Sequence, residues 1–109
     1  MEFTTLTDRY AVAAQISVTD VKALTAAGFS TVICNRPDGE DPGQPSAADI
    51  AAACEAAGIE FHHIPVVSAP IDANDVAQQQ RVVEAAKGLT LAYCRSGQRS
   101  AVIFQMGLA

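Results

Sequence analysis

The stretch LTLAYCRSGQRS, residues 89–100, gives the clearest indication of the fold of this chain. Its first five residues, 89–93, are mostly apolar and end at a tyrosine, which is typical of a buried strand. Cys94 follows directly, and a polar run leads to Ser100, where we predict that a final helix begins. A strand that passes through a short loop into a helix is one unit of a parallel sheet. Ligands of such sheets bind beyond the carboxyl ends of the strands.

Three further apolar segments precede this unit and alternate with helical ones. We predict strands over residues 10–16, 29–34 and 59–64, and the second lacks polar alternation, as in a strand buried on both faces. Capping residues and glycines predict three helices between these strands. The first runs from Ser17–Asp20 to Gly28, the second over 47–57 between Ser46 and Gly58, and the third from Asp72 or Asn74 to about Lys87, before Gly88. Prolines and glycines predict loops over 36–46 and 66–71. This alternation predicts a single three-layer α/β/α domain over residues 1–109 with a mostly parallel sheet.

Net charge, apolar runs and cysteine spacing restrict the molecules, membranes and metal ions that the protein could bind. The net charge of −5 argues against nucleic acid or an anionic membrane surface. No apolar run approaches the roughly 20 residues of a membrane span, and residues 1–10 lack a signal-peptide pattern, so we expect a cytoplasmic protein. The three cysteines are widely spaced, with no Cys-x-x-C pair and no cluster of zinc spacing. We therefore expect free thiols, no metal and no cofactor.

The residues after Cys94 are those of an anion-binding loop. A glycine lets the loop curl so that successive backbone N–H groups point inward, and the amino end of the following helix adds positive potential. A thiol in that field has a lowered pKa, and its thiolate is the nucleophile of covalent catalysis. An arginine of the loop could hold an oxyanion with two hydrogen bonds, and the serine hydroxyls could donate to the sulfur or its adduct. We predict Cys94 and Arg99 as catalytic residues and a binding loop of Arg95, Ser96, Gly97, Gln98 and Ser100.

Three further residues are candidates for the mouth of the site or for an acid. Arg36, in the loop RPDGE after the second strand, either adds positive charge to the mouth or pairs with Asp38 or Glu40 to hold the loop rigid. Asp38 is also a candidate for a remote acid. Asp72 is a candidate acid near the predicted loop 66–71, or only the cap of the helix that follows.

The other cysteines and the two histidines fit structural roles. Cys34 lies late in a buried strand and Cys54 in an alanine-rich helix, so both are predicted to be core residues rather than resolving thiols. His62 and His63 are neighbours on one strand and point to opposite faces of the sheet. They therefore cannot bind one metal ion together in the usual way.

The loop YCRSGQRS (93–100) resembles the active-site loop of rhodanese-type sulfurtransferases. The chain as a whole resembles the small bacterial phosphatase-like domains named after beta-lactamase hydrolase-like proteins, some of which are labelled sulfur transferases. The matching stretches are VICNRPDGE (32–40), AAGIEFHHIPV (56–66) and LAYCRSGQRS (91–100). The resemblance implies the fold of dual-specificity protein tyrosine phosphatases, with Cys94 as nucleophile and the loop 94–99 around the anionic group or sulfur adduct. It also implies that the chain is part of a larger multidomain protein.

The sequence departs from the phosphatase pattern at two places. That pattern has five residues between the cysteine and the arginine, which would put the arginine at position 100. In this chain Ser100 stands at that position and Arg99 comes one residue earlier. Dual-specificity phosphatases carry an aspartate where Ser68 stands, and such an acid protonates the leaving oxygen. A persulfide suits the tighter loop, because it adds a single sulfur atom, and a thiolate leaving group needs no acid.

We therefore predict a sulfurtransferase that carries a persulfide on Cys94. One alternative is a phosphatase of the protein tyrosine or dual-specificity type, which acts through a phosphocysteine. Another is a non-catalytic persulfide- or anion-binding module of a sulfur-metabolising protein. The predicted partner is a small-molecule or protein sulfur donor and acceptor, or a phosphorylated substrate in the phosphatase alternative.

Overall fold

The computed structural model describes residues 1–67 and 70–108, which form one sheet with helices on both sides. Within them β2, β5, β3 and β4 run parallel, and β1 pairs antiparallel with β2. The five strands have the order β1-β2-β5-β3-β4, with β1 at Thr4–Thr5, β2 at Tyr10–Ala13, β5 at Leu89–Tyr93, β3 at Phe29–Cys34 and β4 at Glu60–His63. The predicted mostly parallel sheet is confirmed, with β5 at its centre.

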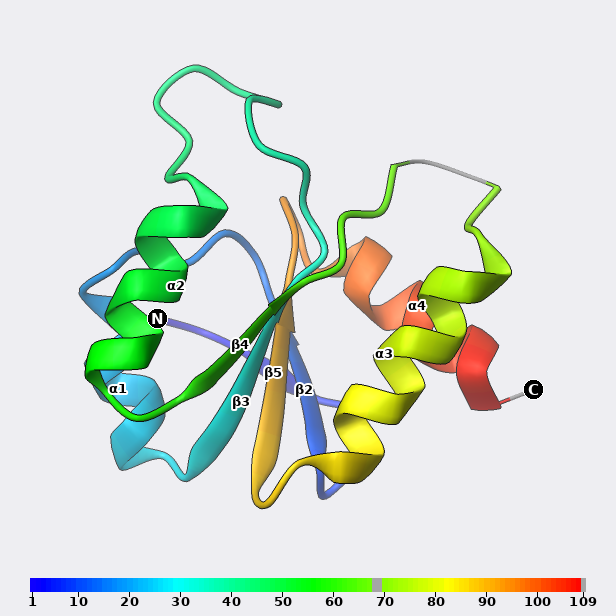
Figure 1. Ribbon diagram of the computed structural model, residues 1–109, viewed down its shortest axis with the longest axis horizontal. Helices are drawn as coiled ribbons and strands as arrows, with labels where there is room; N and C mark the ends of the chain where they lie inside the picture. The colour runs from blue at the N-terminus through cyan, green and yellow to red at the C-terminus, as the bar shows by residue number, and fades with distance from the viewer. Residues whose placement is uncertain (68–69, 109) are drawn as a thin grey trace.

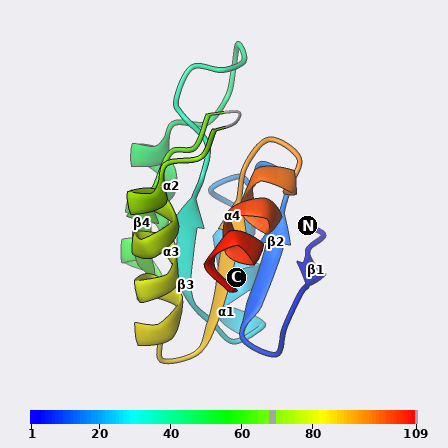
Figure 2. The ribbon, with the colours of Figure 1, turned by 90° about the vertical axis from the view of Figure 1, so that its right-hand side faces the viewer.

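Helices cover both faces of this sheet (Figure 1). α1 (Asp20–Ala26) and α2 (Ala47–Ala56) lie on one face, and α3 (Ala73–Ala85) and α4 (Gln98–Leu108) lie on the other. Figure 2 shows α3 and α4 side by side in front of the sheet, with β1 at its edge. The predicted three-layer α/β/α arrangement is therefore confirmed. None of the described helices is both long and apolar enough to cross a bilayer.

Each face of the sheet has its own hydrophobic core. Val32 of β3 joins the cluster under α1 and α2, and the next residue, Ile33, joins the cluster under α3 and α4. Both side chains are fully buried. Successive strand residues point to opposite faces, so a strand covered on both sides must be apolar throughout. This explains why residues 29–34 show no polar alternation.

The helix starts follow the predicted capping residues. Ser46 Oγ accepts the backbone N–H of Asp49 at 3.1 Å at the start of α2, and Asp72 Oδ1 accepts that of Asn74 at 2.7 Å at the start of α3. Asp72, and not Asn74, is therefore the cap of α3. Ser17 and Asp20 exchange backbone-to-side-chain hydrogen bonds before α1, as the capping-type pattern predicts.

Several predicted boundaries were wrong by a few residues. The strand predicted over 10–16 ends at Ala13, because Ala13 pairs with Tyr93 and Tyr93 is the last residue of β5. The strand predicted over 59–64 is Glu60–His63. The last helix begins at Gln98 rather than Ser100, because Ser96 Oγ accepts the Gln98 N–H at 3.2 Å. The two-residue strand β1 was not predicted, since two residues carry no periodicity.

A buried polar network ties α3 to the sheet and to the start of α4. Gln79 of α3 exchanges hydrogen bonds with the side-chain amide of Asn35 at 2.8 and 3.1 Å, and its Nε2 also donates to the Tyr10 hydroxyl at 3.0 Å. Tyr10 in turn donates to the Ser100 carbonyl at 2.8 Å. These groups are almost completely excluded from water, so their partners must come from the protein.

Replacing Gln79 by alanine should lower the free energy of unfolding by about 1–3 kcal/mol, because the buried Asn35 amide and Tyr10 hydroxyl lose their partner. Denaturant unfolding measures this loss. Gln78→Ala is the matched control, since Gln78 is exposed on the same helix and its replacement should change stability by no more than about 0.5 kcal/mol. Equal losses for the two variants would contradict the role of the network.

Candidate active site at the end of strand β5

Cys94 lies directly after the central strand, at the carboxyl edge of the parallel sheet. Its side chain is fully buried. Its backbone N–H donates to the Ala13 carbonyl at 3.3 Å, which fixes the start of the loop against the end of β2. The chain segments that follow β3 and β4 leave the sheet at the same edge (Figure 1). The topology thus brings the RPDGE loop (36–40) and the Cys94 loop (94–99) to one end of the domain.

Backbone N–H groups gather around the Cys94 sulfur. The Gly97 N–H donates to Sγ at 3.0 Å. Burial alone would raise the pKa of the Cys94 thiol, but hydrogen bonds from the backbone of Ser100, Ser96 and Gly97 outweigh it and leave the pKa below its ordinary value. The nucleophilic role of Cys94 stays a prediction. The loop resembles the nests of N–H groups that bind anions.

Gly97 makes this geometry possible. Its φ is +95°, a region that a residue with a Cβ adopts only with strain. A Cβ at this position would also lie 3.4 Å from the backbone carbon and oxygen of Ala13. The glycine therefore lets the loop turn tightly beneath the end of β2.

The two loop serines have different roles. Ser96 is exposed, and its hydroxyl caps the first turn of α4 instead of facing the sulfur. The Ser100 hydroxyl is buried and contributes to the lowered pKa of Cys94, yet it has no hydrogen-bond partner of good geometry among the described residues. Gln98 is exposed at the start of α4.

Both loop arginines have acidic partners, and the Arg99 guanidinium also lies near the Cys94 sulfur. Arg95 is 70% exposed, and its Nε lies 3.3 Å from Asp41 Oδ2. Arg99 forms a bidentate pair with Glu40, with Nη1 to Oε2 at 2.8 Å and Nη2 to Oε1 at 2.7 Å. Arg99 Nη1 also donates to the Val66 carbonyl at 2.8 Å. The sequence did not predict Glu40 as a site residue.

The Glu40–Arg99 pair is reflected in the pKa of both groups. Hydrogen bonding to Arg99, with a further contribution from Arg36, lowers the pKa of Glu40 to about 2. Hydrogen bonding to Glu40 raises the pKa of Arg99, and the nearby Cys94 thiolate adds to the effect. Glu40 is therefore ionised at neutral pH and does not serve there as a general acid.

Arg36 holds the RPDGE loop rigid. Its side chain is 3% exposed, and it donates to Glu40 at 2.9 Å, to Asp41 at 2.6 Å and to Gln15 at 3.0 Å. Of the two predicted roles, the structure shows the pairing one, with Glu40 rather than Asp38 as the partner. The Glu40 and Asp41 carboxylates balance the positive charge of Arg36, so this charge does not add to the attraction of an anion at the entrance to the site.

The candidate acids Asp38 and Asp72 serve helix starts. Asp38 Oδ1 accepts the Ala47 N–H at 2.8 Å at the beginning of α2, and Asp72 caps α3. Both hydrogen bonds use the carboxylate as an acceptor. Ser68, which stands where an acid would be expected, lies outside the described residues.

The remaining cysteines and histidines have local partners or a core position. Burial raises the pKa of Cys34, and it raises that of Cys54 to about 11. His63 Nε2 lies 2.9 Å from the Arg36 carbonyl, and His62 lies 3.3 Å from Glu60. Across residues 1–67 and 70–108 no three potential ligands are grouped so that they could hold a metal ion.

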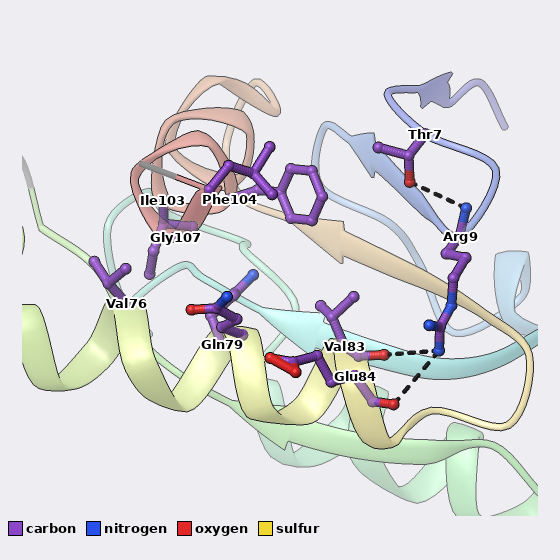
Figure 3. Close-up of a pocket in the computed structure, with 11 residues that line it drawn as sticks. Thr7, Arg9, Val76, Gln79, Val83, Glu84, Ile103, Phe104 and Gly107 are labelled. Atoms are coloured by element: carbon purple, nitrogen blue, oxygen red, sulfur yellow. Dashed lines mark hydrogen bonds between the residues drawn. The ribbon is translucent and has the colours of Figure 1, made fainter.

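A pocket elsewhere on the domain contains none of the predicted site residues (Figure 3). It has a volume of about 170 Å³ and is lined mainly by apolar side chains of α3 and α4, among them Val76, Val83 and Phe104. Arg9 closes one end of it and donates to the Val83 and Glu84 carbonyls at 3.3 and 3.5 Å. This contact satisfies carbonyl groups at the end of α3.

The family model for the phosphatase-like domain of beta-lactamase hydrolase-like proteins matches residues 2–109. The chain belongs to this family. A beta-lactamase hydrolase-like protein of Agrobacterium fabrum is 34% identical over 109 residues, which are all of this chain and 25% of that protein. One from Xylella fastidiosa is 28% identical over 106 residues, again 25% of its length. The chain thus spans about a quarter of the length of the curated relatives it matches.

Solved structures agree with this assignment. A phosphatase candidate from Neisseria meningitidis is 34% identical and has a TM-score of 0.85, with 93% of this chain and 72% of that chain covered. The P. aeruginosa protein TpbA, solved in complex with phosphotyrosine, shares the fold at 18% identity and a TM-score of 0.71, with 95% and 60% covered. The phosphatase-like fold of the dual-specificity type is therefore confirmed. The comparisons favour the phosphatase alternative and give no support to sulfur transfer.

Replacing Gly97 by alanine should cost about 1–2 kcal/mol of stability, because a residue with a Cβ must adopt positive φ. It should also slow the alkylation of Cys94 by iodoacetamide at neutral pH, because the loop N–H groups move off the sulfur. Gly58→Ala is the matched control, since Gly58 has a φ of +76° and open space around it. Equal alkylation rates in Gly97→Ala and wild type would contradict the role of the loop amides.

Glu40 should stabilise the fold in a pH-dependent way. Its folded pKa of about 2 lies below the ordinary value of 4.5, so its stabilising effect is complete above pH 4.5 and is lost as the pH falls toward 2. The difference in unfolding free energy between wild type and Glu40→Gln should shrink over that range, as measured by denaturant unfolding at several pH values. A difference that stays constant with pH would show that the ion pair does not form.

Proposed function

We propose that the domain is a cysteine-dependent sulfurtransferase that carries a persulfide on Cys94. This proposal rests on the different surroundings of the Cys94 sulfur and of the Arg99 guanidinium. The loop N–H groups surround the sulfur, while the Arg99 guanidinium is occupied by Glu40 and the Val66 carbonyl. Such a site offers hydrogen bonds to one additional sulfur atom, while both terminal nitrogens of Arg99 already donate to a carboxylate.

Two displacement steps make up the proposed reaction. The Cys94 thiolate attacks the outer sulfur of the donor, and a sulfur–sulfur bond forms as the donor's own bond to that sulfur breaks. The remainder of the donor leaves with the electron pair of the broken bond. An acceptor thiolate or cyanide then attacks the outer sulfur of the persulfide, and Cys94 leaves as a thiolate. Neither step requires a general acid, which agrees with an ionised Glu40 and with Asp38 and Asp72 engaged at helix starts.

The second candidate is phosphate ester hydrolysis, and the comparisons favour it. The family is described as phosphatase-like, and the similar Neisseria protein is described as a phosphatase candidate. In this reaction Cys94 would attack phosphorus, the alcohol would leave with a proton, and water would cleave the phosphocysteine. The phosphate would be held by the loop N–H groups and by the two Arg99 N–H donors that Glu40 and the Val66 carbonyl leave unused. A phosphorylated small molecule or protein would then be the substrate.

Intact-mass spectrometry after incubation with thiosulfate or glutathione persulfide tests the first proposal. Wild type should gain the mass of one sulfur atom, and cyanide or a reductant should remove it. Cys94→Ser should gain nothing, whereas the matched control Cys54→Ser should behave as wild type, since Cys54 lies in the core with a raised pKa.

The same variants tested with an aryl phosphate decide between the candidates. Phosphate release that depends on Cys94, without any sulfur adduct, would overturn the sulfurtransferase proposal in favour of the phosphatase. If neither reaction depends on Cys94, the domain is better explained as a persulfide- or anion-binding module of a longer protein.

A further inference from the structure

Asn35 is completely buried at the point where the RPDGE loop leaves β3. Its backbone and side chain use every hydrogen-bond donor and both acceptor oxygens of an asparagine. The backbone N–H donates to the Tyr93 carbonyl at 2.8 Å, and the backbone carbonyl accepts the Val66 N–H at 3.0 Å. The side-chain Nδ2 donates to the Ile64 carbonyl at 3.0 Å and to Gln79 Oε1 at 2.8 Å, and Oδ1 accepts from Gln79 Nε2 at 3.1 Å. Asn35 thus ties the ends of β5 and β4 to α3.

One set of these contacts leads to Arg99. Val66, whose N–H bonds to the Asn35 carbonyl, accepts a hydrogen bond from Arg99 Nη1 on its own carbonyl at 2.8 Å. The Asn35 side chain holds the same segment at Ile64, two residues earlier. The placement of the guanidinium near the Cys94 sulfur thus depends on a segment that Asn35 holds at two points.

A second set of contacts leads to the Cys94 sulfur. Gln79, which is paired with the Asn35 amide, donates to the Tyr10 hydroxyl at 3.0 Å. Tyr10 in turn donates to the Ser100 carbonyl at 2.8 Å. Burial opposes the ionisation of Cys94, and the Ser100 N–H is among the backbone groups whose hydrogen bonds outweigh burial and lower the pKa of this thiol. The peptide groups of Ser100 are therefore held on one side by the buried network and on the other by the sulfur.

We propose that Asn35 is a positioning residue that fixes the Arg99 guanidinium and the Ser100 N–H relative to the Cys94 sulfur. All of its polar groups are occupied by other protein groups, so it acts only through the groups that it holds. An aspartate would lack the two side-chain donors, and a leucine would lack all three side-chain contacts. The inference rests on the proposed role of Cys94 as the nucleophile, which sulfur transfer and phosphate hydrolysis share, and not on the choice between them.

Alkylation of Cys94 by iodoacetate and by iodoacetamide tests the placement of Arg99. Both reagents modify the same sulfur, but only iodoacetate carries a negative charge that a nearby guanidinium attracts. The ratio of the two rates therefore reports on Arg99 and does not depend on the ionised fraction of the thiol. Wild type should favour iodoacetate, and Arg99→Met should lose this preference. Asn35→Ala should lower the ratio by about threefold or more, because the attraction weakens as the two charges move apart.

The midpoint of thiolate formation, followed by ultraviolet absorbance, tests the placement of the Ser100 N–H. Each protein is compared with the same protein carrying Cys94→Ser, so that only this sulfur is observed. Asn35→Ala should raise the midpoint by about one pH unit, which is the order expected when one hydrogen bond to a charged group weakens. A loss of stability alone should move neither readout while the protein remains folded.

Ile50→Val is the matched control for stability. Ile50 is fully buried in the core under α1 and α2, on the face of the sheet opposite to Gln79. Its replacement removes one methylene group from that core and leaves the contacts of Asn35 in place. Both the ratio of alkylation rates and the midpoint should equal those of wild type.

A wild-type value of either readout in folded Asn35→Ala would overturn the proposal. So would shifts of equal size in Ile50→Val, because loss of stability would then explain them. If Asn35→Ala does not fold, as judged by circular dichroism, Asn35→Ser takes its place, since its short hydroxyl side chain replaces fewer of the amide contacts but remains polar. Asn35→Ser should shift both readouts in the same direction, and wild-type values would again overturn the proposal.

These outcomes are separate from those of the proposed reaction. Failure of sulfur transfer shows as the absence of a persulfide on Cys94 in wild type, whatever Asn35→Ala does. Failure of the present inference shows as an unchanged rate ratio or midpoint in Asn35→Ala, whether or not the persulfide forms. If both proposals hold, Asn35→Ala should also accept sulfur from thiosulfate more slowly than wild type at neutral pH, whereas Ile50→Val should react at the wild-type rate.

Discussion

The hydrogen bond from the Gly97 N–H to the Cys94 sulfur is the contact on which the rest of the site depends. It requires a positive φ at Gly97, a tight approach to the end of β2, and a helix that starts immediately after the loop. β5 lies at the centre of the sheet, and the neighbouring strands end level with Tyr93, so the Cys94 N–H can bond to the end of β2. Burial disfavours the charged thiolate and raises the pKa of Cys94. The hydrogen bonds from the loop N–H groups lower this pKa by more than burial raises it.

The second half of the site comes from the neighbouring strand. β3 leads into the RPDGE loop, and the buried Arg36 gathers Glu40, Asp41 and Gln15 around its guanidinium. Burying a guanidinium is unfavourable unless its charge is paired, so the loop is fixed by the partners that Arg36 requires. One consequence is that Glu40 faces Arg99. The positive charges of Arg99 and Arg36 are thereby paired with carboxylates of the same domain.

Local sequence signals predicted most of the fold. The apolar run 29–34, the caps Ser46 and Asp72, and the cysteine at a strand end each depend on neighbouring residues, and each was confirmed. The two-residue β1 and the early start of α4 were missed because they depend on pairing with β2 and on the Ser96 cap. Glu40 was missed as a site residue because its contact with Arg99 spans 59 positions in the sequence. The i,i+4 spacing of Arg36 and Glu40, in a loop at the carboxyl edge of the sheet, was the available signal.

The ionisation of Cys94, on which the proposed chemistry depends, can be measured directly. The thiolate absorbs in the ultraviolet more strongly than the thiol, so the difference in absorbance between wild type and Cys94→Ser reports on this one sulfur as the pH is raised. We predict a midpoint clearly below the ordinary thiol value of 9.0. A midpoint at or above that value would mean that burial outweighs the loop N–H groups, and Cys94 would then not be the nucleophile of this domain.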